Sequence, residues 1–204
     1  MGSDHPLLLI VMLAGGGWLG WTWWEDVRDA RQGHPNPRAF PGATPAGRPA
    51  LILAVTGTLV LLAAETAGEN ALGLTAEQSQ MTVLFGLYTL AAAFIEELIF
   101  RGYLVLTHKG RAMLVAGIVG ASLIFALLHP FLWEWRDGTL HLHFTAKAWF
   151  STGAIFVGSL WFYTLRFMPL NSGRSLAPCI AAHVTKNLGV FVIKYAQGFV
   201  SGWW

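Results

Sequence analysis

The sequence has 204 residues, of which 54% are hydrophobic and 12% charged, with a formal net charge of +2. Soluble domains carry roughly 25% charged residues, so the composition excludes an ordinary soluble domain, and the small net charge excludes a nucleic-acid-binding surface. The single cysteine, Cys179, excludes an internal disulfide framework. Long apolar blocks occupy most of the chain, which predicts an all-α, polytopic transmembrane helical bundle in contact with the lipid bilayer.

Six apolar blocks are long enough to cross about 30 Å of hydrocarbon, which takes roughly 20 helical residues. They fall at about 6–24, 50–67, 81–106, 112–132, 148–168 and 176–198. The first block follows Asp4 and His5 and no basic stretch, so we expect a retained span and not a cleaved signal peptide. Residues 1–204 are expected to form one integral membrane domain, in which residues 1–80 supply two accessory spans and residues 81–204 a core that carries the motifs.

The basic residues predict the orientation of the spans. They concentrate in the first, third and fifth loops: Arg28, Arg31, Arg38, Arg48, Lys109, Arg111, Arg166 and Arg174. Because loops rich in lysine and arginine stay on the cytoplasmic side, we expect the odd loops inside and both termini outside. Tryptophan favours the headgroup level, and eight tryptophans stand near the ends of blocks: Trp18, Trp21, Trp23, Trp24, Trp133, Trp135, Trp203 and Trp204.

The stretch "FIEELIFRG" places three ionisable residues inside the third apolar block. Residues four apart on a helix are neighbours, so Glu97 and Arg101 are predicted to form an ion pair on one face. Glu96 is rotated by about 100° from Glu97 and needs an environment of its own. Ionisable residues at membrane depth are costly and usually functional.

Two further polar groups lie on later blocks. "FALLH" places His129 one turn after Phe125 on the fourth, and "HVTKN" places His183 and Asn187 on one face of the sixth. Two carboxylates, two imidazoles and an amide can therefore converge in one bundle. His129 lies roughly 10 Å too near the outer end of its span to meet the others, if that helix starts at Arg111, which calls for a tilted or displaced fourth helix.

These groups are the parts needed to hydrolyse a peptide bond without a covalent intermediate. A carboxylate in a low-dielectric site is a stronger base, and with a histidine it could hold and deprotonate a water molecule. A second histidine and an amide can donate hydrogen bonds to the oxyanion of a tetrahedral intermediate. Glutamate and histidine could instead ligate Zn²⁺.

"EELIFR", "FALLH" and "HVTKN" resemble the E-E-x-x-x-R, F-x-x-x-H and H-x-x-x-N motifs of the CPBP family of intramembrane endopeptidases. This family comprises the CAAX prenyl (Rce1-type) proteases and the bacteriocin-processing proteases, also called the ABI family. The resemblance covers about residues 94–187 and includes the segment that leads to the third motif. It implies a hydrolase, of glutamate type or metal-dependent, in a multi-pass protein of the bacterial inner (plasma) membrane.

The resemblance also implies roles for the motif residues. Glu96 resembles the water-activating glutamate, acting with His129, while Glu97 and Arg101 resemble its supporting pair. The oxyanion-stabilising pair would be His183 and Asn187. In a metal-dependent enzyme the Zn²⁺ ligands would be Glu96, His129 and His183. The implied substrate is a membrane-anchored protein or peptide. A prenylated CaaX protein, a leader peptide and a C-terminal sorting anchor are the alternatives.

Several alternatives compete with these interpretations. A proton-coupled transporter could use the same ionisable groups, although no inverted repeat is evident, and a family member without activity could serve in bacteriocin immunity or as a scaffold. Cys179 could act with His183 as a nucleophile, but a packing role is favoured. His141 and His143 could extend a metal site, but are expected to be surface residues. Gly16 and Gly20 form a G-x-x-x-G, which usually marks close helix packing.

Overall fold

The computed structural model describes residues 5–107 and 110–204 and contains the six long helices that the apolar blocks predict. The helices are α1 (Pro6–Arg31), α2 (Arg48–Ala71), α3 (Val83–Glu97), α4 (Gly110–Leu128), α5 (Ala146–Phe167) and α6 (Ala177–Ala196). Short helices add η1 (Thr75–Glu77), η2 (Leu98–Tyr103) and η3 (Pro169–Asn171), and two strands form an antiparallel hairpin, β1 (Trp133–Arg136) and β2 (Thr139–Leu142). The helical membrane-bundle class is confirmed, with the hairpin as an addition.

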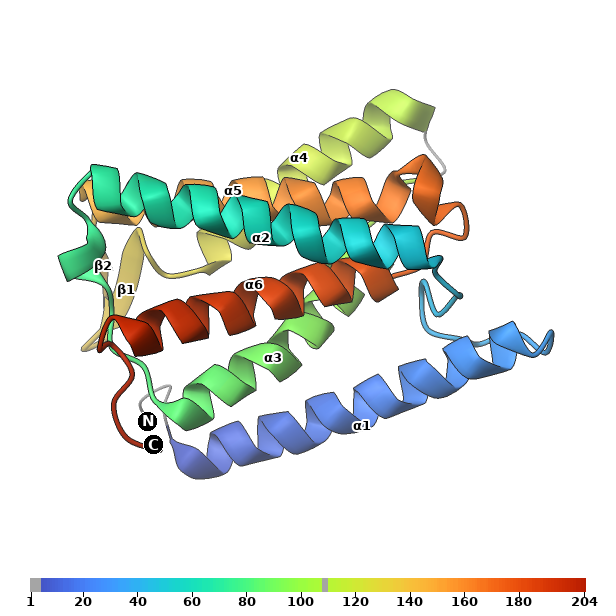
Figure 1. Ribbon diagram of the computed structural model, residues 1–204, viewed down its shortest axis with the longest axis horizontal. Coiled ribbons are helices and arrows are strands. Elements are labelled where there is room, and N and C mark those ends of the chain that lie inside the picture. Colours follow the sequence, from blue (N-terminus) through green and yellow to red (C-terminus); the bar gives the residue numbers. More distant parts are fainter. Residues whose placement is uncertain (1–4, 108–109) are drawn as a thin grey trace.

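The loops alternate between the two ends of the bundle as the basic residues predict. Figure 1 shows the start of α1, the C-terminus, the α2–α3 connection and the hairpin at one end, which we call the even-loop end. The α1–α2 and α5–α6 connections and the start of α4 lie at the opposite end. Lys109, which the charge argument counts in the third loop, lies outside the described residues. Which end faces the cytoplasm stays a prediction.

In the described part of the chain, four helical segments combine the length and apolar composition of a membrane span: α1, α2, α3 with η2, and α4. The helices α5 and α6, with 22 and 20 residues, are also long enough to cross a membrane, but polar and basic residues interrupt their apolar sequence. Their polar side chains are turned into the bundle, where Ser159 is 0% and His183 5% exposed. Polar residues in membrane helices face the interior because lipid offers them no partner, so the protein is a multi-pass integral membrane protein.

The fourth block ends four residues earlier than the predicted 112–132. The helix α4 stops at Leu128, and His129 to Leu132 form the turn that leads into β1. Pro130 explains this end, because a proline disfavours helical backbone in the residue before it. The first helix is longer than the predicted 6–24 and continues through the charged residues to Arg31.

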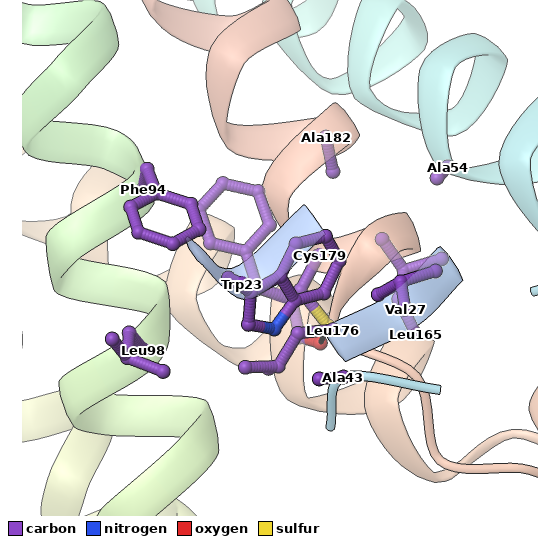
Figure 2. Packing of buried hydrophobic residues seen from close by; sticks show 11 residues of the cluster. Trp23, Val27, Ala43, Ala54, Phe94, Leu98, Leu165, Leu176, Cys179 and Ala182 are labelled. Carbon is purple, nitrogen blue, oxygen red and sulfur yellow. Dashed lines mark hydrogen bonds between the residues drawn. The ribbon is translucent and has the colours of Figure 1, made fainter. Parts of the chain in front are cut away.

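A hydrophobic core joins α1 to the motif-bearing helices. Figure 2 shows Trp23 among Phe94, Leu98, Leu176 and Cys179, and its ring meets that of Phe94 edge to face with centroids 6.0 Å apart. Trp23 is 6% exposed, so it packs inside the bundle, whereas the neighbouring Trp18, Trp21 and Trp24 are exposed. The depth of all four in the bilayer stays a prediction.

Only the first glycine of the G-x-x-x-G in α1 lies at a close helix contact. A methyl group on Gly16 would approach Cβ of Ala91 in α3 to 3.0 Å, whereas one on Gly20 would meet nothing within 4 Å. We therefore expect Gly16→Leu to lower the free energy of unfolding by about 1–3 kcal/mol through overpacking. The matched control is Gly20→Leu, which should be neutral. Denaturant titration of both variants in detergent checks this, and equal stability of the two would contradict the contact.

Candidate functional site

The carboxyl end of α3 changes from an α-helix into the π-helix η2 directly after the two glutamates. In η2 the amide of Leu104 donates to the carbonyl of Ile99, five residues back. Two backbone carbonyls of η2 accept hydrogen bonds from side chains of α5. The hydroxyl of Tyr163 donates to the carbonyl of Phe100 over 2.7 Å, and Nε of Arg166 donates to the carbonyl of Arg101 over 3.1 Å. Such π-helical turns are frequent at functional sites, and here one positions Arg101.

The predicted ion pair between Glu97 and Arg101 is present and fully buried. Nη1 of Arg101 lies 3.1 Å from Oε1 of Glu97, and both side chains are 0% exposed. The second terminal nitrogen of Arg101 donates to the carbonyl and the hydroxyl of Ser159 at 3.1 and 2.5 Å. The Ser159 hydroxyl in turn donates to that of Ser122 over 2.9 Å. The arginine thus joins η2 to α5 and, through the hydroxyl of Ser159, to α4.

Aromatic rings surround the guanidinium of Arg101. Its central carbon lies 4.7 Å from the ring centroid of Phe125, 4.8 Å from that of Tyr163, 5.2 Å from that of Phe162 and 5.9 Å from that of Phe100. A cation over an aromatic face is attracted by the ring quadrupole, more strongly where water is excluded. The rings and Glu97 together compensate a charge that would otherwise be too costly to bury.

His183 lies between the two glutamates. Its Nδ1 is 2.8 Å from Oε1 of Glu97, its Nε2 is 3.6 Å from Oε2 of Glu96, and its ring stacks on Phe162 with centroids 4.8 Å apart. A carboxylate can only accept, so Nδ1 carries the proton that is donated to Glu97. The lone pair or proton of Nε2 then faces Glu96.

The two glutamates have opposite environments, as their rotation on the helix predicts. Glu97 is buried and accepts from both Arg101 and His183. The Glu96 side chain is 33% exposed and approaches His183 without a direct hydrogen bond. Glu96 is therefore the carboxylate that keeps room for a water molecule or a substrate.

His129 reaches the same region from the end of α4. Its Nδ1 donates to the carbonyl of Phe125 over 2.8 Å, which fixes the proton on that nitrogen and leaves the lone pair on Nε2 in the neutral ring. The ring packs on Phe125 with centroids 4.8 Å apart, and Phe125 lies 5.9 Å from His183. Figure 1 shows α4 inclined to its neighbours, as the predicted mismatch in depth calls for.

Of the two motif histidines, His183 is the one beside Glu96. The predicted joint action of Glu96 and His129 on a water molecule stays a prediction. Asn187 lies one turn after His183 and donates one amide hydrogen to the carbonyl of Thr89 over 2.8 Å. Its second amide hydrogen is the one that could serve a substrate.

Sequence reasoning missed the polar residues that support the site from α4 and α5, which are Ser122, Ser159, Tyr163 and Arg166. The sequence does carry a signal for the two serines: they stand inside apolar spans, where small polar residues often form hydrogen bonds between helices. It also missed two ion pairs that join α2 to its neighbours, Glu65 with Lys186 and Glu69 with Lys147.

Three residues are alternative candidates for a nucleophile or for metal ligands: Cys179, His141 and His143. His141 and His143 are exposed on the hairpin and after it, and Nε2 of His143 lies 3.4 Å from Glu134. Cys179 is 0% exposed and its thiol donates to the carbonyl of Phe162 over 3.2 Å. This geometry fits the packing role and not a nucleophile.

The motif residues do not fit a Zn²⁺ site in this arrangement. Over the described ranges, no group of three or more histidine, cysteine or carboxylate side chains is placed to hold a metal ion. Oε2 of Glu96 and Nε2 of His183 approach to 3.6 Å, but His129 does not complete such a group with them. No step of the chemistry below is therefore assigned to a metal.

Comparison with known proteins identifies the family. A family model described as "Type II CAAX prenyl endopeptidase Rce1-like" matches residues 78–189, which is more than half of the chain. Neither the comparison with curated proteins nor that with solved structures gives a match. The matched segment contains α3, η2, α4, α5 and the part of α6 with His183 and Asn187. This multi-pass membrane protein belongs to the Rce1-like family of CAAX-type endopeptidases.

Proposed function

We propose that the protein is an intramembrane endopeptidase that hydrolyses a peptide bond of a membrane-associated protein or peptide by direct attack of water. The contrast between the two adjacent glutamates carries this proposal. Glu97 is buried and engaged by Arg101 and His183, whereas Glu96 is one-third exposed beside the Nε2 of His183. A general base must reach the water that it deprotonates, and Glu96 has that access.

In the proposed reaction Glu96 takes a proton from water while the water oxygen forms a bond to the carbonyl carbon of the substrate. The neutral Nε2 of His129 accepts a hydrogen bond from the same water and orients it. His183 and the second amide hydrogen of Asn187 donate to the oxyanion that develops. In this role His183 carries a proton on Nε2 as well as the one that Nδ1 donates to Glu97.

The tetrahedral intermediate then collapses and the carbon–nitrogen bond breaks. The departing amine takes the proton held by Glu96, which returns the site to its starting state. The supporting residues Glu97 and Arg101 keep the ring of His183 in place and touch no reacting atom. This follows the logic of other hydrolases, in which a buried carboxylate orients an imidazole.

We test the proposal with purified protein in liposomes that contain one of three membrane-anchored peptides. The peptides carry a prenylated CaaX end, a leader sequence or a C-terminal sorting anchor, and mass spectrometry detects the product. We expect one class to be cleaved, and the proposed bacterial plasma membrane makes the latter two the first to try. Collapse of an imposed pH gradient without cleavage of any of the three would instead support the transporter.

Removal of metal ions is expected to leave cleavage unchanged. The reaction proposed here uses only side chains of the chain itself, so treatment with a zinc chelator should change the rate by less than about twofold, within about 0.4 kcal/mol of the barrier. Rates are compared before and after chelation in the same liposomes. Loss of cleavage on chelation with recovery on added Zn²⁺ would refute direct activation by Glu96.

A further inference from the structure

An elongated cavity lies outside the catalytic groups, between α2, α5 and α6. Its volume is about 420 Å³ and its walls are almost entirely apolar, with Trp149, Val157 and Phe162 on α5 and Leu61 on α2. Trp149 is 58% and Val157 51% exposed, so the cavity opens on the outer, lipid-facing side of α5.

The dimensions of the cavity limit what can enter it. Its lining runs along α5 from Trp149 to Trp161, which is about 18 Å at the helical rise of 1.5 Å per residue. Spread over this length, even the whole space between the protein atoms, about 940 Å³ with the open mouth included, gives a mean cross-section of only about 52 Å². A helix of diameter 10–12 Å needs about 80–110 Å², so a transmembrane helix of a substrate does not fit.

A single hydrocarbon chain does fit. Carbon atoms in contact lie about 4 Å apart, so a polymethylene chain fills a channel of about 20 Å². The length also agrees, since one leaflet contributes about 15 Å of hydrocarbon. The cavity begins near the even-loop end, where Trp149 stacks on Phe144 with centroids 6.1 Å apart, and ends where Nε1 of Trp161 donates to Thr58 over 3.0 Å.

The two charged residues of the lining, Glu65 and Lys186, neutralise each other. They form an ion pair in which the side chains are 21% and 11% exposed, so little charge is turned to the cavity. Two glycines keep the channel open: a methyl group added to Gly153 or Gly158 would meet no atom within 4 Å. Larger residues there would fill the space that a chain needs.

We propose that this cavity binds one acyl chain of a bilayer phospholipid, from the leaflet at the even-loop end. The chain packs on Phe162, whose ring stacks on His183, and so supports the wall behind the catalytic histidine. Binding of the chain does not depend on the proposed function, because it needs only the cavity and the bilayer.

The test measures lipid that stays bound after purification. Wild type and variants are incorporated into vesicles of palmitoyl-oleoyl phosphatidylcholine, extracted with mild detergent and washed, and bound lipid is counted by mass spectrometry. We expect about one retained lipid per wild-type protein, and about tenfold weaker retention, equivalent to about 1.4 kcal/mol, in Gly153→Leu and Gly158→Leu. The matched control is Gly120→Leu on α4, where an added methyl group also meets nothing within 4 Å.

Equal retention by Gly158→Leu and Gly120→Leu would overturn the proposal, as would a wild type that retains no phospholipid. Retention of a lipid-linked peptide but no phospholipid would also overturn it. A second measurement needs no variant: a phospholipid with a photoreactive group on its acyl chain should crosslink to α5 between Trp149 and Trp161. Crosslinks spread evenly over all helices would contradict a bound chain.

Discussion

Arg101→Met is expected to lower the free energy of unfolding by about 3–5 kcal/mol. The substitution leaves Glu97 as a buried carboxylate without its ion-pair partner, and breaking a buried pair costs about this much. It also removes the hydrogen bonds to Ser159 that join η2 to α5. Denaturant or thermal unfolding in detergent measures the change, with Arg136→Met on the exposed hairpin as the control that should stay within about 0.5 kcal/mol.

The double variant Glu97→Gln/Arg101→Met separates the charge from the packing. Replacing both members of a buried pair by neutral groups is often close to neutral, so the double variant should recover most of the lost stability. It should not recover activity, because His183 loses the carboxylate that holds its Nδ1. Additive destabilisation in the double variant would show that the pair is not the source of the effect.

His129→Gln is expected to lower the rate of cleavage by about 100-fold, because His129 orients the attacking water and a misplaced reactant can cost this much. The glutamine amide can still bond the carbonyl of Phe125, but it offers no basic nitrogen to the water. The unfolding temperature should stay close to that of the wild type, because His129 lies after the end of α4. The rate is measured in liposomes on the cleaved peptide.

His141→Gln is the matched control for this variant, since His141 lies exposed on β2 and bonds the hydroxyl of Thr139. Its rate should equal that of the wild type. An undiminished rate in His129→Gln would remove His129 from the reaction, and an equal loss in both variants would point to a general effect on the hairpin region.

Local spacing predicted the parts of the site that lie on one helix. The pairs Glu97 with Arg101 and Phe125 with His129 are four residues apart, and a helix brings such residues together whatever the rest of the fold does. The separation of Glu96 from Glu97 follows from the same geometry. These contacts are present in the structure.

Spacing along one helix does not predict the contacts between different helices. His183 meets Glu97 across 86 residues, and the choice of Glu96 beside His183 and not His129 depends on how α4 and α6 pack. The π-helix after Glu97 leaves no mark in the hydrophobic periodicity, which a single wider turn hardly changes. The burial of Trp23 likewise depends on the packing of α1 against α3 and α6.

The predicted end of the fourth helix at residue 132 is wrong, although the sequence contains a local signal for an earlier end. Pro130 follows His129, and a helix usually ends at or before the residue that precedes a proline. This signal predicts that the fourth helix ends near residue 129, which leaves room for the hairpin. Asp137 and Gly138, a pair typical of tight hairpin turns, connect the two strands, with φ of 53° and 76°.

The most direct measurement of the central claim is the rate of peptide cleavage by Glu96→Gln beside the wild type, at equal amounts of folded protein and after metal removal. Glutamine keeps the size of the side chain and removes the base. We expect a rate at least about 100-fold lower with an unchanged unfolding temperature, because the Glu96 side chain is one-third exposed and bears no buried ion pair. A variant that cleaves as fast as the wild type would show that Glu96 does not activate the water.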